Sequence, residues 1–281
     1  MKVALSGATG FIGRHVLAEL IERGVDVTCL VRPSSMDKAS SLGVRMVPVD
    51  IYDPPVDVHV AAGSPDVLVH LAWNDLSNYQ SLSHFEQELP AQYRFLREML
   101  AGGLSNLVVS GTCFEYGMQS GGLRETSEAL PTNPYGFAKD TLRRQIQYLQ
   151  QTLPFNLVWS RLFYLYGSGQ PRGSLFSLLE DAVEQGQASF DMSGGEQLRD
   201  YLPVTDVARN LVSLALTRQD LGIVNICSGE PISVRRLVEG WVSENGWVID
   251  LNLGHYPYPD YEPMAFWGDD SKLKQILGKN E

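Results

Sequence analysis

The sequence predicts an α/β protein: a doubly wound parallel sheet with a smaller C-terminal lobe. Short apolar segments of strand type alternate with longer segments of helical periodicity up to about residue 166. Such alternation is typical of right-handed crossovers, which place helices on both faces of a parallel sheet. The pattern weakens after residue 166, and this change predicts the smaller lobe.

The first elements are a short apolar strand at 3–7 and a helix at 11–24, which ends in a glycine stop signal. Two longer segments predict helices at 84–103 and 134–151, and Pro90 should kink the first of these or delay its start. YPYPDYEP, at 256–263, is too rich in proline for regular structure. The remaining apolar runs predict strands at 25–31, 44–50, 65–73, 106–112, 155–163 and 223–229.

Charge and cysteine content exclude several classes of protein. The chain of 281 residues has a formal net charge of −11, whereas a nucleic-acid partner requires a basic surface, so we expect no such partner. Cys29, Cys113 and Cys227 form no Cys-x-x-Cys pair, which predicts a reducing compartment and no metal site. No signal peptide or membrane-spanning run is visible, so we expect a cytoplasmic protein without a membrane partner.

A glycine-rich turn, GATGFIG, joins the first strand to the first helix, with Gly7, Gly10 and Gly13 at regular spacing. Glycine allows a tight turn and close approach of a diphosphate, and the helix start adds unpaired N–H groups. A plain strand-to-helix turn is the alternative. The position after an apolar strand at the start of the sequence favours a dinucleotide-binding loop.

The end of the second strand, CLVRPSS, bears on the choice of dinucleotide. Binders of NAD usually present a carboxylate here for the ribose hydroxyls, but this chain presents Arg32. An arginine suits a 2′-phosphate, and Arg14 could assist it. We therefore expect NADP(H) to be favoured over NAD(H), with a solvated loop arginine as the alternative.

In PYGFAK, at 134–139, Tyr135 and Lys139 are four residues apart, so a helix brings them onto one face. By itself this spacing is most often a solvated pair. Its context includes four other motifs in a fixed order: GATGFIG, VVSGTCFEYG (108–117), RLFYLYGSGQ (161–170) and LRDYLPVTDVA (198–208). Together the motifs resemble the extended short-chain dehydrogenase/reductase family, which includes nucleotide-sugar epimerases, dehydratases and reductases.

The resemblance covers residues 1 to about 229 and returns at 266–278. It implies a Rossmann dinucleotide-binding domain at 1–165 plus about 203–229. It also implies a substrate-binding lobe at about 166–202 plus 230–281, which closes over a nucleotide-diphosphate sugar. The helices at 84–103 and 134–151 often pair across a twofold axis in this family, so we expect a homodimer. Its apolar candidates are Tyr93, Phe95, Leu96, Leu100, Ile146 and Leu149.

The resemblance also implies roles for individual residues. The catalytic set would be Thr112, Tyr135 and Lys139. Besides the glycines, Arg32, Tyr135 and Lys139, the cofactor would contact Phe11, Ile12, Asp50, Ile51, Leu71, Ala72 and Phe163. The substrate would contact Thr112, Phe114, Tyr164 and Arg199, with Arg199 at the nucleotide's phosphate.

The chemistry of ketone reduction explains the catalytic set. A ketone that accepts hydride develops negative charge on oxygen, and a tyrosine hydroxyl can supply the proton. The unperturbed tyrosine pKa of about 10 is high for use at neutral pH, so we expect the Lys139 ammonium to lower the pKa of Tyr135. Thr112 would hydrogen-bond the same substrate oxygen.

Departures from the family pattern narrow the reaction. Dehydratases carry Asp and Glu directly after the catalytic threonine, whereas Cys113 and Phe114 stand there; Glu115 is one position late and, on a strand, should face away. Dehydration is therefore not expected. The YPYPDYEPMAFWGD tail and the short chain resemble the reductases that finish deoxysugars, and this resemblance implies NADPH-dependent reduction of a nucleotide-linked 4-keto-6-deoxyhexose. An NAD-dependent 4-epimerase is the alternative, and a non-catalytic Rossmann redox sensor is a remote one.

Overall fold

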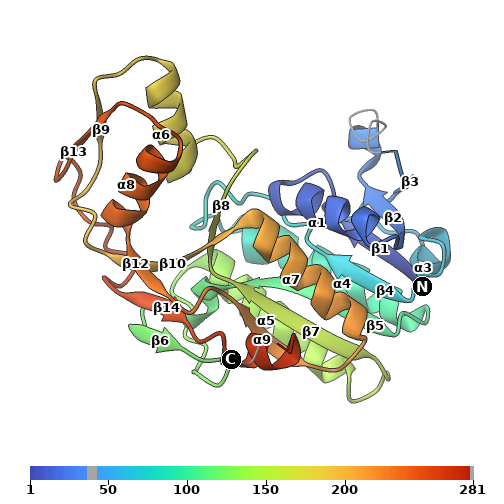
Figure 1. Cartoon of the computed structure of the whole chain (residues 1–281). Helices are drawn as coiled ribbons and strands as arrows, with labels where there is room; N and C mark the ends of the chain where they lie inside the picture. The colour runs from blue at the N-terminus through green and yellow to red at the C-terminus, as the bar shows by residue number, and fades with distance from the viewer. Residues whose placement is uncertain (37–42, 279–281) are drawn as a thin grey trace.

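In the computed structural model, which describes residues 1–36 and 43–278, the seven predicted strands form one parallel sheet (Figure 1). Its order is β11-β7-β5-β4-β1-β2-β3, so the chain winds outward from β1 in both directions. The winding direction reverses between β1 and β4, and in such sheets ligands bind at the carboxyl ends of the strands at this point. The strands are β1 (Lys2–Ser6), β2 (Asp26–Val31), β3 (Arg45–Pro48), β4 (Val67–His70), β5 (Asn106–Thr112), β7 (Asn156–Leu162) and β11 (Gly222–Ile226).

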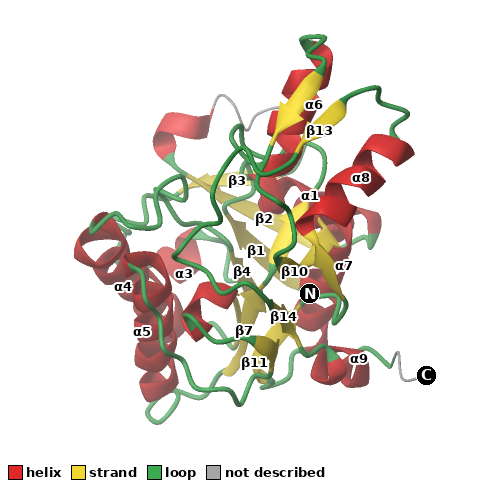
Figure 2. Ribbon diagram, turned by 90° about the vertical axis from the view of Figure 1, so that its left-hand side faces the viewer, coloured by secondary structure: helices red, strands yellow, loops and turns green. Residues whose placement is uncertain are grey.

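Helices cover both faces of this sheet (Figure 2). The first face packs against α1 (Phe11–Glu22) and α7 (Val204–Thr217), and the second against α3 (Val58–Ala61), α4 (Leu89–Ala101) and α5 (Pro134–Leu149). Successive strand side chains point to opposite faces, so Val67 and Val69 enter the first core and Leu68 the second. The strands read as continuous apolar runs because both faces are buried.

The predicted helix at 84–103 is divided as its proline suggests. A π-helical turn (η3, His84–Glu88) comes first, and α4 begins at Leu89 with Pro90 in its first turn. A proline there removes an N–H that has no helical partner in any case, so the delayed start is confirmed. The strand predicted at 65–73 is shorter, since β4 ends at His70 and the residues after it form a loop.

The C-terminal part of the chain builds three small sheets: β8 (Tyr164–Tyr166) with β10 (Leu198–Pro203) and β12 (Pro231–Ser233), β9 (Ser189–Asp191) with β13 (Asp250–Asn252), and β6 (Gly121–Leu123) with β14 (Phe266–Gly268). The remaining helices are α6 (Leu175–Glu184), α8 (Val234–Glu244), α9 (Ser271–Ile276) and the 3-10 turns η1 (Pro33–Ser35) and η4 (Cys113–Tyr116). A separate core around Trp241 joins α6 and α8.

As predicted, residues 256–263 form no helix or strand. The division into a Rossmann domain and a substrate lobe stays a prediction, and residues 279–281 of that lobe lie outside the described range. No helix in the described part of the chain is long and apolar enough to cross a membrane.

The homodimer stays a prediction, but the structure reassigns its candidate surface. Phe95, Leu96, Leu100 and Ile146 are buried in the protein's own core and are unavailable to a partner. On α5, Phe137 is 50% exposed and Tyr148 69% exposed, on the same side of the helix.

We expect Phe137→Asp to convert a dimer into a monomer, because a carboxylate in an apolar interface is left unpaired. Light scattering at micromolar concentration would measure the mass. Val248→Asp, at an exposed position before β13, is the matched control and should remain dimeric. A monomeric wild type would contradict the prediction.

Candidate active site

The glycine loop folds tightly onto itself and onto the loop after β4. Gly7 has φ +77°, and a Cβ there would stand 2.8 Å from the backbone nitrogen of Ala72. A Cβ on Gly13 would stand 1.9 Å from the Gly7 carbonyl oxygen. The predicted residues Leu71 and Ala72 are thereby brought against the loop. Gly10 caps α1 without a side-chain hydrogen bond, so the helix start can accept an anion.

Arg32 lies exposed directly after β2, and its Nη1 donates to Asn74 Oδ1 at 3.4 Å. Asn74 Nδ2 in turn donates to the Tyr52 hydroxyl at 2.8 Å, so three loops meet at the strand tips. The Asp50 carboxylate accepts from the Tyr52 backbone N–H at 2.9 Å and so stabilises the turn in which both residues lie. Arg14 instead donates to the Gly169 carbonyl at 2.8 Å.

Thr112 is the last residue of β5, and the chain turns immediately after it. Thr112 Oγ1 accepts from the Phe114 N–H, and Glu115 Oε1 accepts from the Thr112 N–H at 2.9 Å, a capping box that starts η4. The expectation that Glu115 lies on a strand is therefore wrong. The Thr-x-x-Glu spacing is itself the signal for this cap.

The predicted catalytic pair, Tyr135 and Lys139, lies on α5, one turn apart, as the spacing predicts. Asn133 caps the helix by accepting from the Gly136 N–H at 2.8 Å, and Pro134 occupies the first turn. Tyr135 and Lys139 are both buried. Lys139 Nζ donates to the Ser110 carbonyl at 2.8 Å and lies 3.9 Å from the centre of the Trp73 ring.

Burial sets the protonation of this pair. It raises the pKa of Tyr135 above its usual value, and interaction with Thr112 acts in the lowering direction. Burial lowers the pKa of Lys139 to about 7, against raising contributions from Glu115 and Glu88. The expected lowering of the pKa of Tyr135 is thus not found, because desolvation by burial is the largest influence on this hydroxyl and raises its pKa. Tyr135 carries its proton at neutral pH.

Four aromatic side chains enclose Tyr135: Phe114, which was predicted to contact the substrate, and three others that the sequence analysis did not name. Tyr79 stacks on it with ring centres 5.2 Å apart, and His84 lies at 5.2 Å, Trp73 at 6.1 Å and Phe114 at 6.4 Å. Of these three, only Trp73, at the end of an apolar run, carried a sequence signal. This enclosure keeps water from the tyrosine and accounts for its raised pKa.

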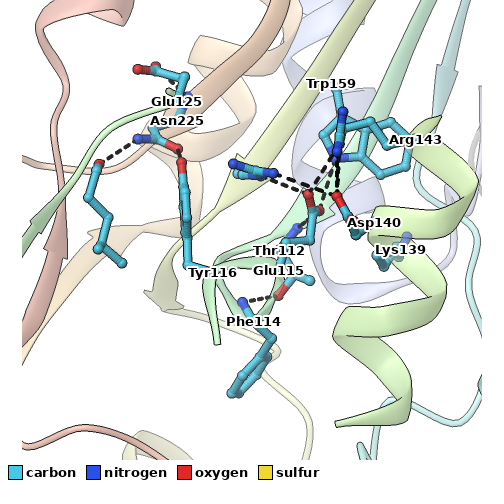
Figure 3. A network of polar contacts seen from close by, with 12 residues as sticks. Thr112, Phe114, Glu115, Tyr116, Glu125, Lys139, Asp140, Arg143, Trp159 and Asn225 are labelled. Carbon is cyan, nitrogen blue, oxygen red and sulfur yellow. Dashed lines mark hydrogen bonds and ion pairs between the residues drawn. The ribbon is translucent and has the colours of Figure 1, made fainter. Parts of the chain in front are cut away.

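A second group of residues, which the sequence analysis missed, lies next to the predicted catalytic residues Thr112 and Lys139 (Figure 3). The fully buried Glu115 carboxylate accepts from Trp159 Nε1 at 2.9 Å and from Arg161 Nε at 2.7 Å. Asp140, next to Lys139, accepts from Arg143 and Arg144. These contacts tie the end of β5, α5 and β7 together, so they hold Thr112 and Lys139 in place.

The predicted substrate residues divide between two places. Phe114 lies beside Tyr135, and Phe163, which was predicted to contact the cofactor, is buried beside Cys113 and Cys227. Tyr164 and Arg199 instead line a cavity of about 680 Å³ between α6 and residues 256–262. Within the described ranges, no group of three or more His, Cys, Asp or Glu side chains could hold a metal ion.

Comparison with known proteins agrees with this geometry. Residues 3–227 match the model of the NAD dependent epimerase/dehydratase family. The chain belongs to this family. It is an NAD(P)-dependent enzyme of the class that acts on nucleotide sugars, and the resemblance inferred from the motifs is confirmed.

Curated relatives and solved structures extend the match over nearly the whole chain. A dTDP-6-deoxy-L-talose 4-dehydrogenase (NAD(+)) from Aggregatibacter actinomycetemcomitans is 30% identical over 95% of this chain and 99% of its own. A dTDP-6-deoxy-L-talose 4-dehydrogenase (NAD(P)(+)) from Kitasatospora kifunensis is 27% identical, over 92% of this chain and 83% of its own. A structure of a UDP-glucuronic acid 4-epimerase from Bacillus cereus has a TM-score of 0.83 at 22% identity and covers 100% of this chain and 94% of its own. This similarity supports the assignment of the fold.

Proposed function

We propose that this chain reduces the C4 ketone of a nucleotide-linked 4-keto-6-deoxyhexose, with NADPH as the hydride donor. Two relatives are named as 4-dehydrogenases of a dTDP-linked 6-deoxyhexose, and such a reaction run in reverse is a 4-ketone reduction. The places of the dehydratase acid and base hold Cys113 and Phe114. Cys113 is buried, and burial raises its pKa, so it carries no charge for elimination chemistry.

The observation that carries the proposal is the protonated, buried Tyr135 beside Thr112. Reduction needs a proton donor at the ketone oxygen, and a tyrosine whose pKa is raised holds its proton at neutral pH. Thr112 supplies a second hydroxyl for the same oxygen. The glycine loop and the start of α1 fit the diphosphate of the dinucleotide, whose nicotinamide supplies the hydride.

The test supplies the enzyme with NADPH and with dTDP- or UDP-linked 4-keto-6-deoxyhexose. The loss of NADPH absorbance measures the reduction. A reductase consumes one NADPH for each sugar converted. The alternative, an NAD-dependent 4-epimerase, purifies with NAD retained and shows no net consumption. The redox sensor, a third possibility, binds the cofactor and turns over neither sugar. Either of these two results would replace the reductase assignment.

We also propose that the enzyme prefers NADP(H) over NAD(H), since Arg32 stands exposed at the tip of β2 and the segment CLVRPSS (29–35) contains no carboxylate. One relative is named for NAD(+) and the other for NAD(P)(+), so the cofactor varies among similar chains.

Arg32→Ala should weaken NADPH binding and leave NADH binding nearly unchanged. A hydrogen bond to a charged group contributes roughly 1.5–3 kcal/mol, which corresponds to roughly a ten- to hundredfold preference. Titration of both cofactors would measure it, with the exposed Arg236→Ala on α8 as the matched control. A wild type that prefers NADH would disprove the role of Arg32.

A further inference from the structure

Arg199, which the resemblance assigns to the phosphate, is already occupied by a carboxylate of the same chain. Its Nε and Nη2 both donate to Glu262 Oε2, at 3.3 and 2.9 Å. Its Nη1 donates to the carbonyl oxygens of Leu198 and Met264, at 2.9 and 3.4 Å. The side chain is 3% exposed and lies over the Phe266 ring. The guanidinium is therefore fixed in place, and the fork that suits a phosphate faces Glu262.

Glu262 belongs to the proline-rich segment 256–263, called the strap below. Backbone hydrogen bonds pin the chain at both ends of the strap: His255 donates to the Met192 carbonyl at 2.9 Å, and Leu198 donates to the Met264 carbonyl at 2.8 Å. The three strap prolines have no N–H to donate. Between the pinned ends, Glu262 carries the principal polar contacts, since its other oxygen accepts from the Tyr164 hydroxyl.

The charge of the cavity makes this contact significant. Of the described residues that line the cavity, Arg199 is the only cation, while the carboxylates are Asp181, Asp191 and Glu262. With Glu262 on Arg199, a diphosphate would enter a cavity of net negative charge. The negative charges of the diphosphate and of Glu262 repel each other, so the ligand and Glu262 compete for one arginine.

We propose that Glu262 acts as a latch: it holds the strap over Arg199, and the diphosphate of the substrate must displace this carboxylate to bind. The inference rests on the proposed function, because it takes a nucleotide diphosphate as the ligand. Displacement moves Glu262 toward solvent and transfers the guanidinium fork from carboxylate to phosphate. Tyr164 loses its acceptor in the same step and becomes free to donate to the ligand.

The latch predicts that neutralising Glu262 tightens diphosphate binding. Calorimetry on the full chain with dTDP and with UDP would compare wild type, Glu262→Gln and Asp260→Asn. Asp260 is an exposed carboxylate on the same strap, so its variant has the same net charge and is the matched control. Loss of a competing charged contact should tighten binding to Glu262→Gln roughly ten- to hundredfold, whereas Asp260→Asn should bind like wild type.

Equal or weaker binding to Glu262→Gln than to wild type would overturn the latch, because Glu262 would then support the ligand site rather than compete for it. If neither diphosphate binds to any of the three proteins while NADPH still binds, the proposed substrate class fails and the latch fails with it. The two failures are thus distinguishable.

Hydrogen exchange gives a second and independent readout. Exchange of the Leu198 and His255 amides, which donate to the Met264 and Met192 carbonyls at the two ends of the strap, should increase in Glu262→Gln without ligand, and in wild type when a diphosphate saturates the site. Unchanged exchange in both conditions would show that Glu262 does not hold the strap, and it would overturn the proposal.

Discussion

Tyr135→Phe is expected to lower turnover by a factor on the order of a hundred to ten thousand, the usual contribution of general acid catalysis. The variant keeps the ring that stacks on Tyr79 and loses only the hydroxyl. Steady-state rates with the 4-keto sugar and NADPH measure the effect. Cofactor binding should persist, because the glycine loop and Arg32 are untouched.

Tyr148→Phe is the matched control, since Tyr148 lies on the same helix and is 69% exposed. It should turn over like wild type. If Tyr135→Phe also turns over like wild type, Tyr135 has no part in the chemistry and the proposed mechanism is wrong.

Glu115→Gln is expected to cost about 3–5 kcal/mol in the free energy of unfolding, because it leaves a buried cation without its counter-charge. Glu115 is fully buried and pairs with Arg161, which is 1% exposed. Urea unfolding would measure the loss. Glu98→Gln, which breaks an exposed pair with Arg97, is the control and should cost less than about 1 kcal/mol.

Removing both charges distinguishes an ion pair from simple packing. In Glu115→Gln with Arg161→Met neither member of this pair is left as a buried charge without its partner, so much of the lost stability should return. A double variant as unstable as the sum of two single losses would show that the two residues do not interact.

Local patterns were sufficient for the framework of the molecule. Apolar runs located all seven strands of the sheet, because strands buried on both faces must be apolar throughout. Pro90 located the start of α4, and the four-residue spacing placed Tyr135 and Lys139 on one face of α5. These features depend on backbone geometry and on neighbours within one helix turn or one strand.

The tertiary structure alone decided the electrostatics of the site. Glu115 meets Arg161 across 46 positions and Arg199 meets Glu262 across 63, and no periodicity within either segment indicates these pairs. The protonation of Tyr135 and Lys139 likewise follows from burial under Trp73, Tyr79 and His84, which come from a loop and a π-helical turn without a regular pattern. The sequence determined which groups are present and how each segment folds. Desolvation and ion pairing act between segments that only packing brings together. These two effects therefore decided which groups are charged and which are already paired with another side chain of the protein.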